Sequence, residues 1–283
     1  MNLVISTTIG WNIGDQFILS GVKNLLKKSW GDFQCVHHDR NPFKLPRGGE
    51  ESHNAIRCGW ADALVIAGSP GWTIECAAIY RTALDHNVPI YMIGIGAGCH
   101  SALLGEQLLH DHDTTEALNK AKLVICRDEI ARDEASKYCG GIELLPCPAA
   151  MISSYAFNSF TAAQFREDLM ALGPYYTGDF SERGLMAHQI EDVEKSNGRA
   201  FYSENADDYF IQYVKAKSVT SFRLHASVIC RVFGVPITNL WPDDDCRCVS
   251  TWSVIDSAFR YGIRKSFDRY VELLEKVKPN INH

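Results

Sequence analysis

Short apolar runs alternate with helix-like segments through the first half of the chain. The runs at residues 63–67 and 123–126 are continuously apolar, as strands buried on both faces are. Between the runs, apolar residues recur at helical spacing, as Ile18, Val22 and Leu25 do. This alternation restricts the fold to a parallel sheet covered by helices on both faces. We expect strands at residues 3–8, 33–37, 63–67, 89–95 and 123–126, and helices at 14–28, 75–85, 114–121 and 128–139.

The second half alternates less regularly, and the strong strand pattern lapses around Cys147 and Pro148. We therefore expect an N-terminal Rossmann-like domain at residues 1–149 and a smaller Rossmann-like domain, with a closing helix, at 150–283. In the second domain we expect helices at 159–172, 181–195, 207–215 and 264–277, and strands at 199–203, 219–222 and 235–240.

Composition excludes several classes of function. The net charge of −6 disfavours general nucleic-acid binding, which needs a basic surface. The sequence contains no run of 18 apolar residues, so no membrane span is expected. The N-terminal residues begin an expected strand and lack the pattern of a signal peptide. Most of the ten cysteines lie inside apolar runs, and none forms a Cys-x-x-Cys pair. We interpret them as buried, reduced thiols of a cytoplasmic protein.

Two histidine-rich stretches are weak candidates for metal binding. They are residues 37–39 (His-His-Asp) and 110–113 (His-Asp-His-Asp). Either could ligate a metal, but a solvated turn or helix face explains them more simply. We therefore expect no metal site and no cofactor.

An Arg and a His mark the corner between an expected strand and an expected helix in the second half. Arg223 and His225 follow the strand at 219–222, and Gly234 and Pro236 end the helix that begins with them. Ligands of open parallel sheets bind at such carboxyl ends, where helix N-termini favour anions. The pair would place a fixed cation beside a group that moves a proton near neutral pH. The alternative is a buried polar pair that only holds the corner.

Four loops of the first half also follow expected strands and could bind substrate. Arg127 follows the strand at 123–126, where its planar guanidinium suits a carboxylate or phosphate ligand. The alternative is a salt bridge between Arg127 and a neighbouring acidic residue. The remaining candidates for substrate binding lie in the other three loops. They combine glycines that let a ligand approach the backbone, an acidic side chain that could cap a helix or accept a sugar hydroxyl, and a tryptophan ring that could stack on a sugar: Asn12, Gly14, Asp15, Gly68, Ser69, Gly71, Trp72, Gly94 and Gly96. The glycines at 94, 96 and 98 lack the helix and distant acid of a dinucleotide fingerprint, so a NAD site is not expected.

Taken in order, these loops resemble the polysaccharide pyruvyl transferase family. The resemblance rests on Asn-Ile-Gly-Asp at 12–15, Gly-Ile-Gly at 94–96, Arg-Asp-Glu at 127–129, and Arg-Leu-His-Ala at 223–226 followed by Gly-Val-Pro at 234–236. The chain departs from the family at two places. The family's glycine triplet is Gly-Ser-Pro-Gly at 68–71, and its Asp-Pro-Ala is Cys-Pro-Ala at 147–149.

The resemblance implies an α/β fold of two Rossmann-like domains facing across a cleft, as in GT-B glycosyltransferases, with a reduced second domain. It implies phosphoenolpyruvate as donor, a sugar or glycan as acceptor, His225 as general acid, and Arg127 and Arg223 as anion-binding catalytic residues. Assembly into a homo-oligomer is a further option. Two other functions stay open: a GT-B-type glycosyltransferase that uses a nucleotide sugar, and a non-catalytic glycan- or anion-binding module.

Overall fold

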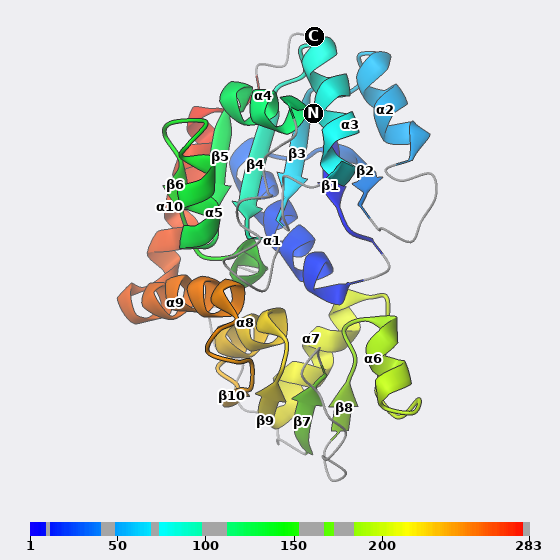
Figure 1. Ribbon diagram of the computed structural model, residues 1–283, viewed down its shortest axis with the longest axis vertical. Helices are drawn as coiled ribbons and strands as arrows, with labels where there is room; N and C mark the ends of the chain where they lie inside the picture. The colour runs from blue at the N-terminus through cyan, green and yellow to red at the C-terminus, as the bar shows by residue number, and fades with distance from the viewer. Residues whose placement is uncertain are drawn as a thin grey trace.

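The structure is a computed structural model that describes residues 1–9, 12–40, 49–68, 74–97, 112–152, 167–172 and 184–279. Figure 1 shows two α/β units, with the N-terminal sheet above and the C-terminal sheet below. All strand pairs in both sheets are parallel. The expectation of two Rossmann-like α/β domains is confirmed.

The N-terminal sheet has the strand order β2-β1-β3-β4-β5-β6. The order reverses between β1 and β3, and ligands of such sheets bind beside this reversal at the carboxyl ends of the strands. The strands are β1 (Asn2–Thr7), β2 (Gln34–Asp39), β3 (Ala63–Ala67), β4 (Ile90–Ile95), β5 (Leu123–Cys126) and β6 (Glu143–Leu144). The helices are α1 (Ile13–Trp30), α2 (Glu50–Arg57), α3 (Ile74–Asp85), α4 (His112–Lys120) and α5 (Glu129–Ala135).

The C-terminal sheet has the order β10-β9-β7-β8, and an isolated parallel bridge joins Met186 to Phe201 beyond β8. Its strands are β7 (Glu167–Ala171), β8 (Gly184–Met186), β9 (Ala216–Ser221) and β10 (Ile237–Asn239). The helices that follow are α6 (Ile190–Lys195), α7 (Ala206–Lys215), α8 (Leu224–Phe233), α9 (Cys246–Tyr261) and α10 (Ile263–Lys276).

Two helix predictions were wrong where strands form. The helix expected at 159–172 ends in β7, and the helix expected at 181–195 is β8 followed by the shorter α6. Leu169 and Ala171 pack in one hydrophobic cluster while Met170 and Leu172 pack in another, so both faces of β7 are buried. Burial on two faces overrode the helix propensity of Glu, Leu, Met and Ala. Helices α2 and α9 were not predicted.

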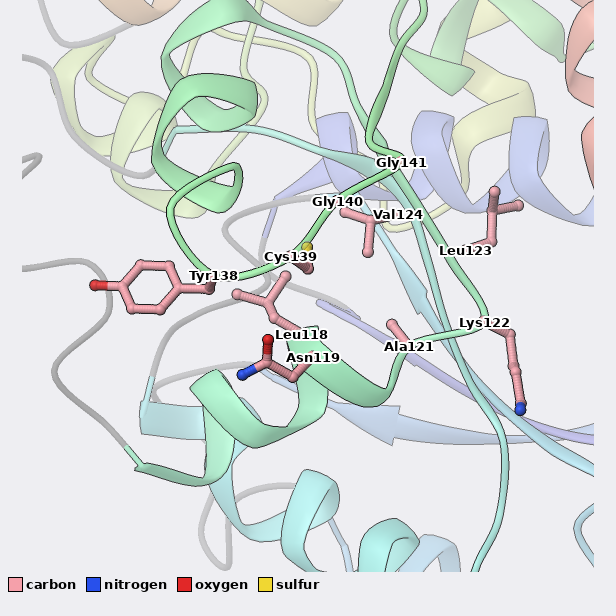
Figure 2. A pocket seen from close by; sticks show the side chains of 10 residues that line it. All are labelled: Leu118, Asn119, Ala121, Lys122, Leu123, Val124, Tyr138, Cys139, Gly140 and Gly141. Carbon is pink, nitrogen blue, oxygen red and sulfur yellow. The ribbon is translucent and has the colours of Figure 1, made fainter.

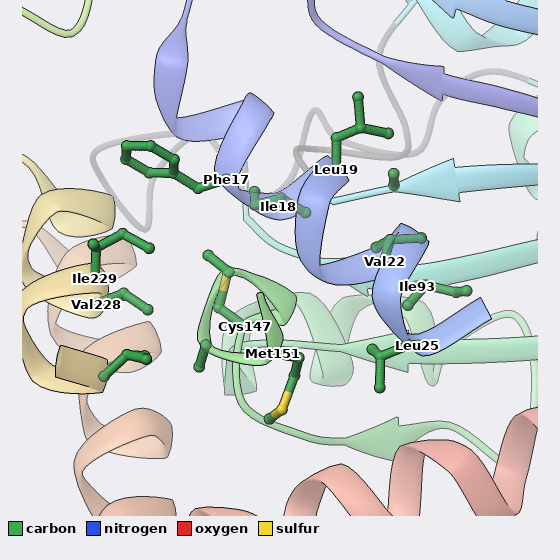
Figure 3. Close-up of a cluster of buried hydrophobic side chains, with 14 of the residues drawn as sticks. Phe17, Ile18, Leu19, Val22, Leu25, Ile93, Cys147, Met151, Val228 and Ile229 are labelled. Atoms are coloured by element: carbon green, nitrogen blue, oxygen red, sulfur yellow. The ribbon is translucent and has the colours of Figure 1, made fainter. Parts of the chain in front are cut away.

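One hydrophobic cluster extends across both domains. A short 3-10 helix, η2 (Pro148–Met151), packs against α1 and α8, as Figure 3 shows for Met151 and Cys147 beside Val228 and Ile229. A Cβ on Gly21 of α1 would overlap the backbone oxygen of Pro148, so a glycine is needed there. The expected domain boundary after residue 149 falls within η2.

Helix α10 returns to the N-terminal sheet, beside β5 and β6 in Figure 1. Trp30 Nε1 donates to the oxygen of Leu274 at 2.8 Å, and the Tyr270 hydroxyl donates to the oxygen of Pro146 at 2.8 Å. Helix α10 is therefore part of the N-terminal core. No helix in the described ranges is both long enough and apolar enough to cross a membrane.

Candidate functional site

Side chains from both domains meet between the carboxyl ends of the two sheets. Arg127 follows β5, and its Nη1 lies 3.2 Å from Nε2 of His225 in the first turn of α8. Nearby, the backbone N–H of Ile13 in α1 donates to the oxygen of His188 at 3.1 Å. The predicted convergence of the Arg127 loop and the Arg-Leu-His corner on one site is therefore present.

Arg127 is 3% exposed. Its backbone N–H donates to the backbone oxygen of Ile95 at 2.8 Å, and this hydrogen bond fixes the position of the residue at the end of β5. Its guanidinium contacts Cys147 Sγ at 3.8 Å, while its buried Nε has no hydrogen-bond partner among the described residues. Burial lowers the pKa of Arg127, but Cys147, Asp128 and Asp15 outweigh this effect and raise it overall. Arg127 is thus a buried cation with a donor left over for a ligand.

The following residue, Asp128, has a structural role. It is fully buried and caps α5 by accepting from Ala131 N at 2.8 Å. Its other oxygen accepts from Ala97 N at 3.0 Å and from the hydroxyl of Thr251 at 3.4 Å. Asp128 therefore holds the loop after β4 and helix α9 in place around Arg127.

His225 is held neutral in the free protein. Burial is the main cause that lowers its pKa well below the ordinary value, and the charges of Arg127, Arg247 and Arg223 and the ring of His188 lower it further. Because a guanidinium only donates, Nε2 of His225 must accept from Arg127, which leaves the proton of the neutral ring on Nδ1. The general-acid role expected of His225 therefore requires bound anions that favour the imidazolium.

Two glycines make room for this pair. A Cβ on Gly14 would lie under 3.0 Å from Nδ1 of His225, and a Cβ on Gly96 would lie under 3.0 Å from Nε of Arg127. Asn12 caps α1, its side chain accepting from Gly14 N at 3.0 Å. The structure thus gathers six predicted residues into what we call the interdomain cluster: Asn12, Gly14, Asp15, Gly96, Arg127 and His225.

Other predicted site residues have different surroundings. A Cβ on Gly68 would overlap Ile18, and one on Gly94 would overlap the ring of Pro148, so both glycines allow close packing. Ser69, Gly71 and Trp72 lie outside the described residues.

The guanidinium of Arg223 is engaged within the C-terminal domain. Its Nε donates to the oxygen of Leu172 at 2.8 Å, and its Nη2 donates to Gln189 Oε1 at 2.8 Å and to Asp192 Oδ2 at 2.6 Å. The side chain of Asp192 is 1% exposed, so this is a buried ion pair. The alternative reading of Arg223, a residue that holds the strand-helix corner, matches these contacts.

Arg247, in the first turn of α9, was not singled out from the sequence. It lies in a segment for which no helix was expected, because α9 was not predicted. The sequence feature that could have indicated the start of α9 is Asp245, whose side chain caps the helix by accepting from Cys248 N at 3.1 Å.

Of the two histidine-rich stretches, the first differs from the solvated turn or helix face that we expected. His38 is buried in β2, where its Nδ1 lies 3.0 Å from Ser6 Oγ. In the second, His112 begins α4 with its ring 87% exposed, as expected for a solvated helix face, and residues 110 and 111 lie outside the described residues. His112, Asp113 and Glu116 have ligand atoms close enough together for a metal. However, Arg81 and Lys120 already pair with the two carboxylates.

A separate pocket of about 290 Å³ lies on the N-terminal domain, between α4, β5 and the segment before β6. Figure 2 shows the amino group of Lys122 and the hydroxyl of Tyr138 at opposite sides of it. These groups do not converge on a shared point, so the pocket is a weaker candidate site than the interdomain cluster.

Comparison with known proteins agrees with this arrangement. Residues 12–244 match the family model described as polysaccharide pyruvyl transferase. No curated protein matches the sequence significantly.

The solved structures with a similar fold include two UDP-GlcNAc 2-epimerases. UDP-GlcNAc 2-epimerase from Methanocaldococcus jannaschii is 10% identical with a TM-score of 0.53, covering 99% of this chain and 94% of its own. UDP-GlcNAc 2-epimerase from Neisseria meningitidis, solved with UDP-GlcNAc bound, is 12% identical with a TM-score of 0.53, covering 97% of this chain and 94% of its own. At these identities the likeness shows the fold alone, a GT-B-like pair of domains.

Proposed function

The chain belongs to the polysaccharide pyruvyl transferase family, and from this premise we propose that it transfers a pyruvyl group from phosphoenolpyruvate to hydroxyls of a sugar or glycan acceptor. The observation that carries the proposal is the contact between Arg127 and His225. A buried cation with an unused donor touches a proton carrier from the opposite domain. A transfer that starts from an anionic enol ester needs both groups.

In the proposed reaction, C3 of the donor takes up a proton and becomes a methyl group, which leaves C2 with oxocarbenium character. One acceptor hydroxyl forms a bond to C2 and loses its proton. The C2–O bond to phosphate breaks, and a second hydroxyl forms the other bond of the ketal and loses its proton. One of the two released protons replaces the one delivered to C3, and the other leaves with phosphate.

Donor binding would change the state of His225 through Arg127. When a carboxylate or phosphate of the donor accepts from the Arg127 guanidinium, that group no longer needs His225 Nε2 as acceptor. The negative charge of the donor also favours the imidazolium. His225 then becomes protonated beside the donor and serves as the acid that supplies C3.

Phosphate release measured with phosphoenolpyruvate and a panel of sugar, glycan and lipid-linked acceptors tests the proposal. We expect release that depends on both donor and acceptor, and loss of it in Arg127→Ala. Phosphate release is the chosen readout because it does not depend on knowing the acceptor beforehand.

The nucleotide-sugar alternative makes a different prediction. A ligand that binds only the folded state raises the melting temperature. Stabilisation by UDP-GlcNAc, the ligand of the Neisseria meningitidis epimerase, without stabilisation by phosphoenolpyruvate would favour a nucleotide-sugar enzyme. Stabilisation by phosphoenolpyruvate without turnover of any acceptor would favour the binding module.

A further inference from the structure

Two arginines whose charges act on His225 are incompletely hydrogen-bonded within the described residues. The Nε atoms of both Arg127 and Arg247 are buried without a hydrogen-bond partner among the described residues. Neither forms an ion pair within that part of the chain, and the one hydrogen bond of Arg247 there is a 4.0 Å contact from Nη2 to Cys248 Sγ. Arg223, by contrast, is paired with Asp192.

The first turns of α9 are tied to the loop that carries Arg127. One turn after Arg247, Ser250 Oγ accepts from the backbone N–H of Glu129 at 3.1 Å. The hydroxyl of Thr251 donates to Asp128 at 3.4 Å. These contacts join Arg247 to the opposite domain through the residues that directly follow Arg127 in the sequence.

Arg247 also acts electrostatically on the interdomain cluster. Its charge lowers the pKa of His225, after burial and the charge of Arg127. Two cations that form no salt bridge with a carboxylate in the described residues therefore act on one imidazole. A desolvated guanidinium is costly unless an anion compensates it.

We propose that Arg247 is a second anion-binding residue of this site, which takes one acid group of the donor while Arg127 takes the other. This inference rests on the proposed function, because phosphoenolpyruvate carries both a carboxylate and a phosphate. Arg223 is then a positioning residue that fixes the corner from which His225 projects. Arg247 lies beyond residues 12–244, the part of the chain that matches the family model.

Isothermal titration with phosphoenolpyruvate, and separately with inorganic phosphate, tests the assignment in Arg247→Ala and Arg247→Gln. The Gln variant keeps most of the side chain, so it serves if the Ala variant fails to fold. The matched control is Arg260→Ala, which removes an arginine of the same helix that is 72% exposed and paired with Asp256. We expect affinity for phosphoenolpyruvate to fall about tenfold to a hundredfold in the Arg247 variants and less than twofold in the control.

The outcomes separate this inference from the proposed function. If the wild-type protein binds phosphoenolpyruvate and the Arg247 variants bind it equally well, the role of Arg247 is overturned while the donor stands. If the wild type binds only inorganic phosphate, and Arg247 is needed for that, the anion site stands and the donor is wrong. Binding of neither anion by the wild type overturns both.

A second measurement needs no ligand. The pKa of His225, followed by NMR, should rise in Arg247→Gln, with Arg127, Arg223 and His188 left as its charged and titratable neighbours. An unchanged pKa of His225 would place Arg247 outside the site.

Discussion

Nη1 of Arg127 donates to Nε2 of His225 across 3.2 Å, and the two residues come from different domains. The bond fixes the tautomer of the neutral imidazole, because only an unprotonated Nε2 can accept it. In the proposed reaction it would also link donor binding to proton uptake, since an anion that engages Arg127 removes the reason for Nε2 to stay unprotonated. Domain packing and the proposed acid therefore depend on the same contact.

The pKa of His225 should be low in the free protein and higher with donor bound. Burial, followed by the charges of Arg127 and Arg247, disfavours the imidazolium in the free state. Phosphoenolpyruvate brings negative charge that reverses this effect. NMR titration of the ring, assigned with His225→Gln, should show a neutral imidazole at pH 6.5 without donor and an upward shift of the midpoint with it. No shift on saturation would place the donor away from His225.

Replacing either glycine that borders the pair should displace the pair. The added methyl group of Gly14→Ala would collide with His225, and that of Gly96→Ala with Arg127. We expect each to reduce phosphoenolpyruvate-dependent turnover by about tenfold or more, because a small misplacement of catalytic groups is costly. Gly140→Ala is the control, since no atom lies within 4 Å of its added Cβ. Equal turnover in all three variants would show that the pair tolerates movement.

Removing Arg223 should cost stability. It leaves Asp192, whose side chain is 1% exposed, without its main cationic partner. Breaking a buried pair typically costs about 3–5 kcal/mol. Arg260→Ala, which breaks an exposed pair, should change the free energy of unfolding by less than about 1 kcal/mol. Urea unfolding of both variants compares the two. A small loss in Arg223→Ala, together with weaker donor binding, would instead support the anion-binding role that we first expected for Arg223.

The central strands of the N-terminal sheet could be predicted because their sequences are strongly biased, whereas the two-residue strand β6 was not predicted. Ala63–Ala67 is apolar throughout and became a strand buried on both faces. In the C-terminal domain, Glu167–Ala171 carries good helix formers, and only the neighbouring strands β8 and β9 make it a strand. The pairing of β7 with β8 and β9 cannot be predicted from the local sequence of β7.

The sequence could predict those site residues that belong to motifs at the ends of strands. Arg127 and His225 follow strands directly, so their meeting could be expected from the rule for parallel sheets. Arg247 could not be found in this way, because a loop at residues 240–245 separates β10 from α9, and α9 itself was not predicted. The ion pair of Arg223 with Asp192 joins residues 31 positions apart, and no motif announces it.

Acid should destabilise the protein through its buried histidines. Burial, then Arg40 and His53, lowers the pKa of His38 to about 3, well below its ordinary value of 6.5. Above pH 6.5 the His38 ring is neutral in both the folded and the unfolded state, so it contributes nothing to the pH dependence of the free energy of unfolding. Below that pH the unfolded chain takes up a proton that the folded state refuses, so the free energy of unfolding falls by about 1.4 kcal/mol per pH unit for such a group.

Urea unfolding between pH 7.5 and 5 measures this effect. His38→Asn should flatten the dependence on pH, while His188 and His225, whose pKa values are also lowered, keep part of the slope. His112→Asn, at a ring that is 87% exposed, is the control. A slope that is unchanged in His38→Asn would mean that His38 is not a source of the acid sensitivity.

His225→Gln should cut turnover by about 10²–10⁴, the usual effect of removing a general acid. Donor affinity should change much less, because Arg127 keeps its charge and its place after β5. The proton transfer can be followed without an acceptor, since reversible protonation at C3 exchanges the methylene hydrogens of phosphoenolpyruvate with deuterium from heavy water. We expect exchange in the wild-type protein and its loss in His225→Gln. Gly140→Ala, a change remote from the cluster, should exchange at the wild-type rate. Exchange at full rate in His225→Gln would assign the acid to another group and leave the Arg-Leu-His corner with a positioning role alone.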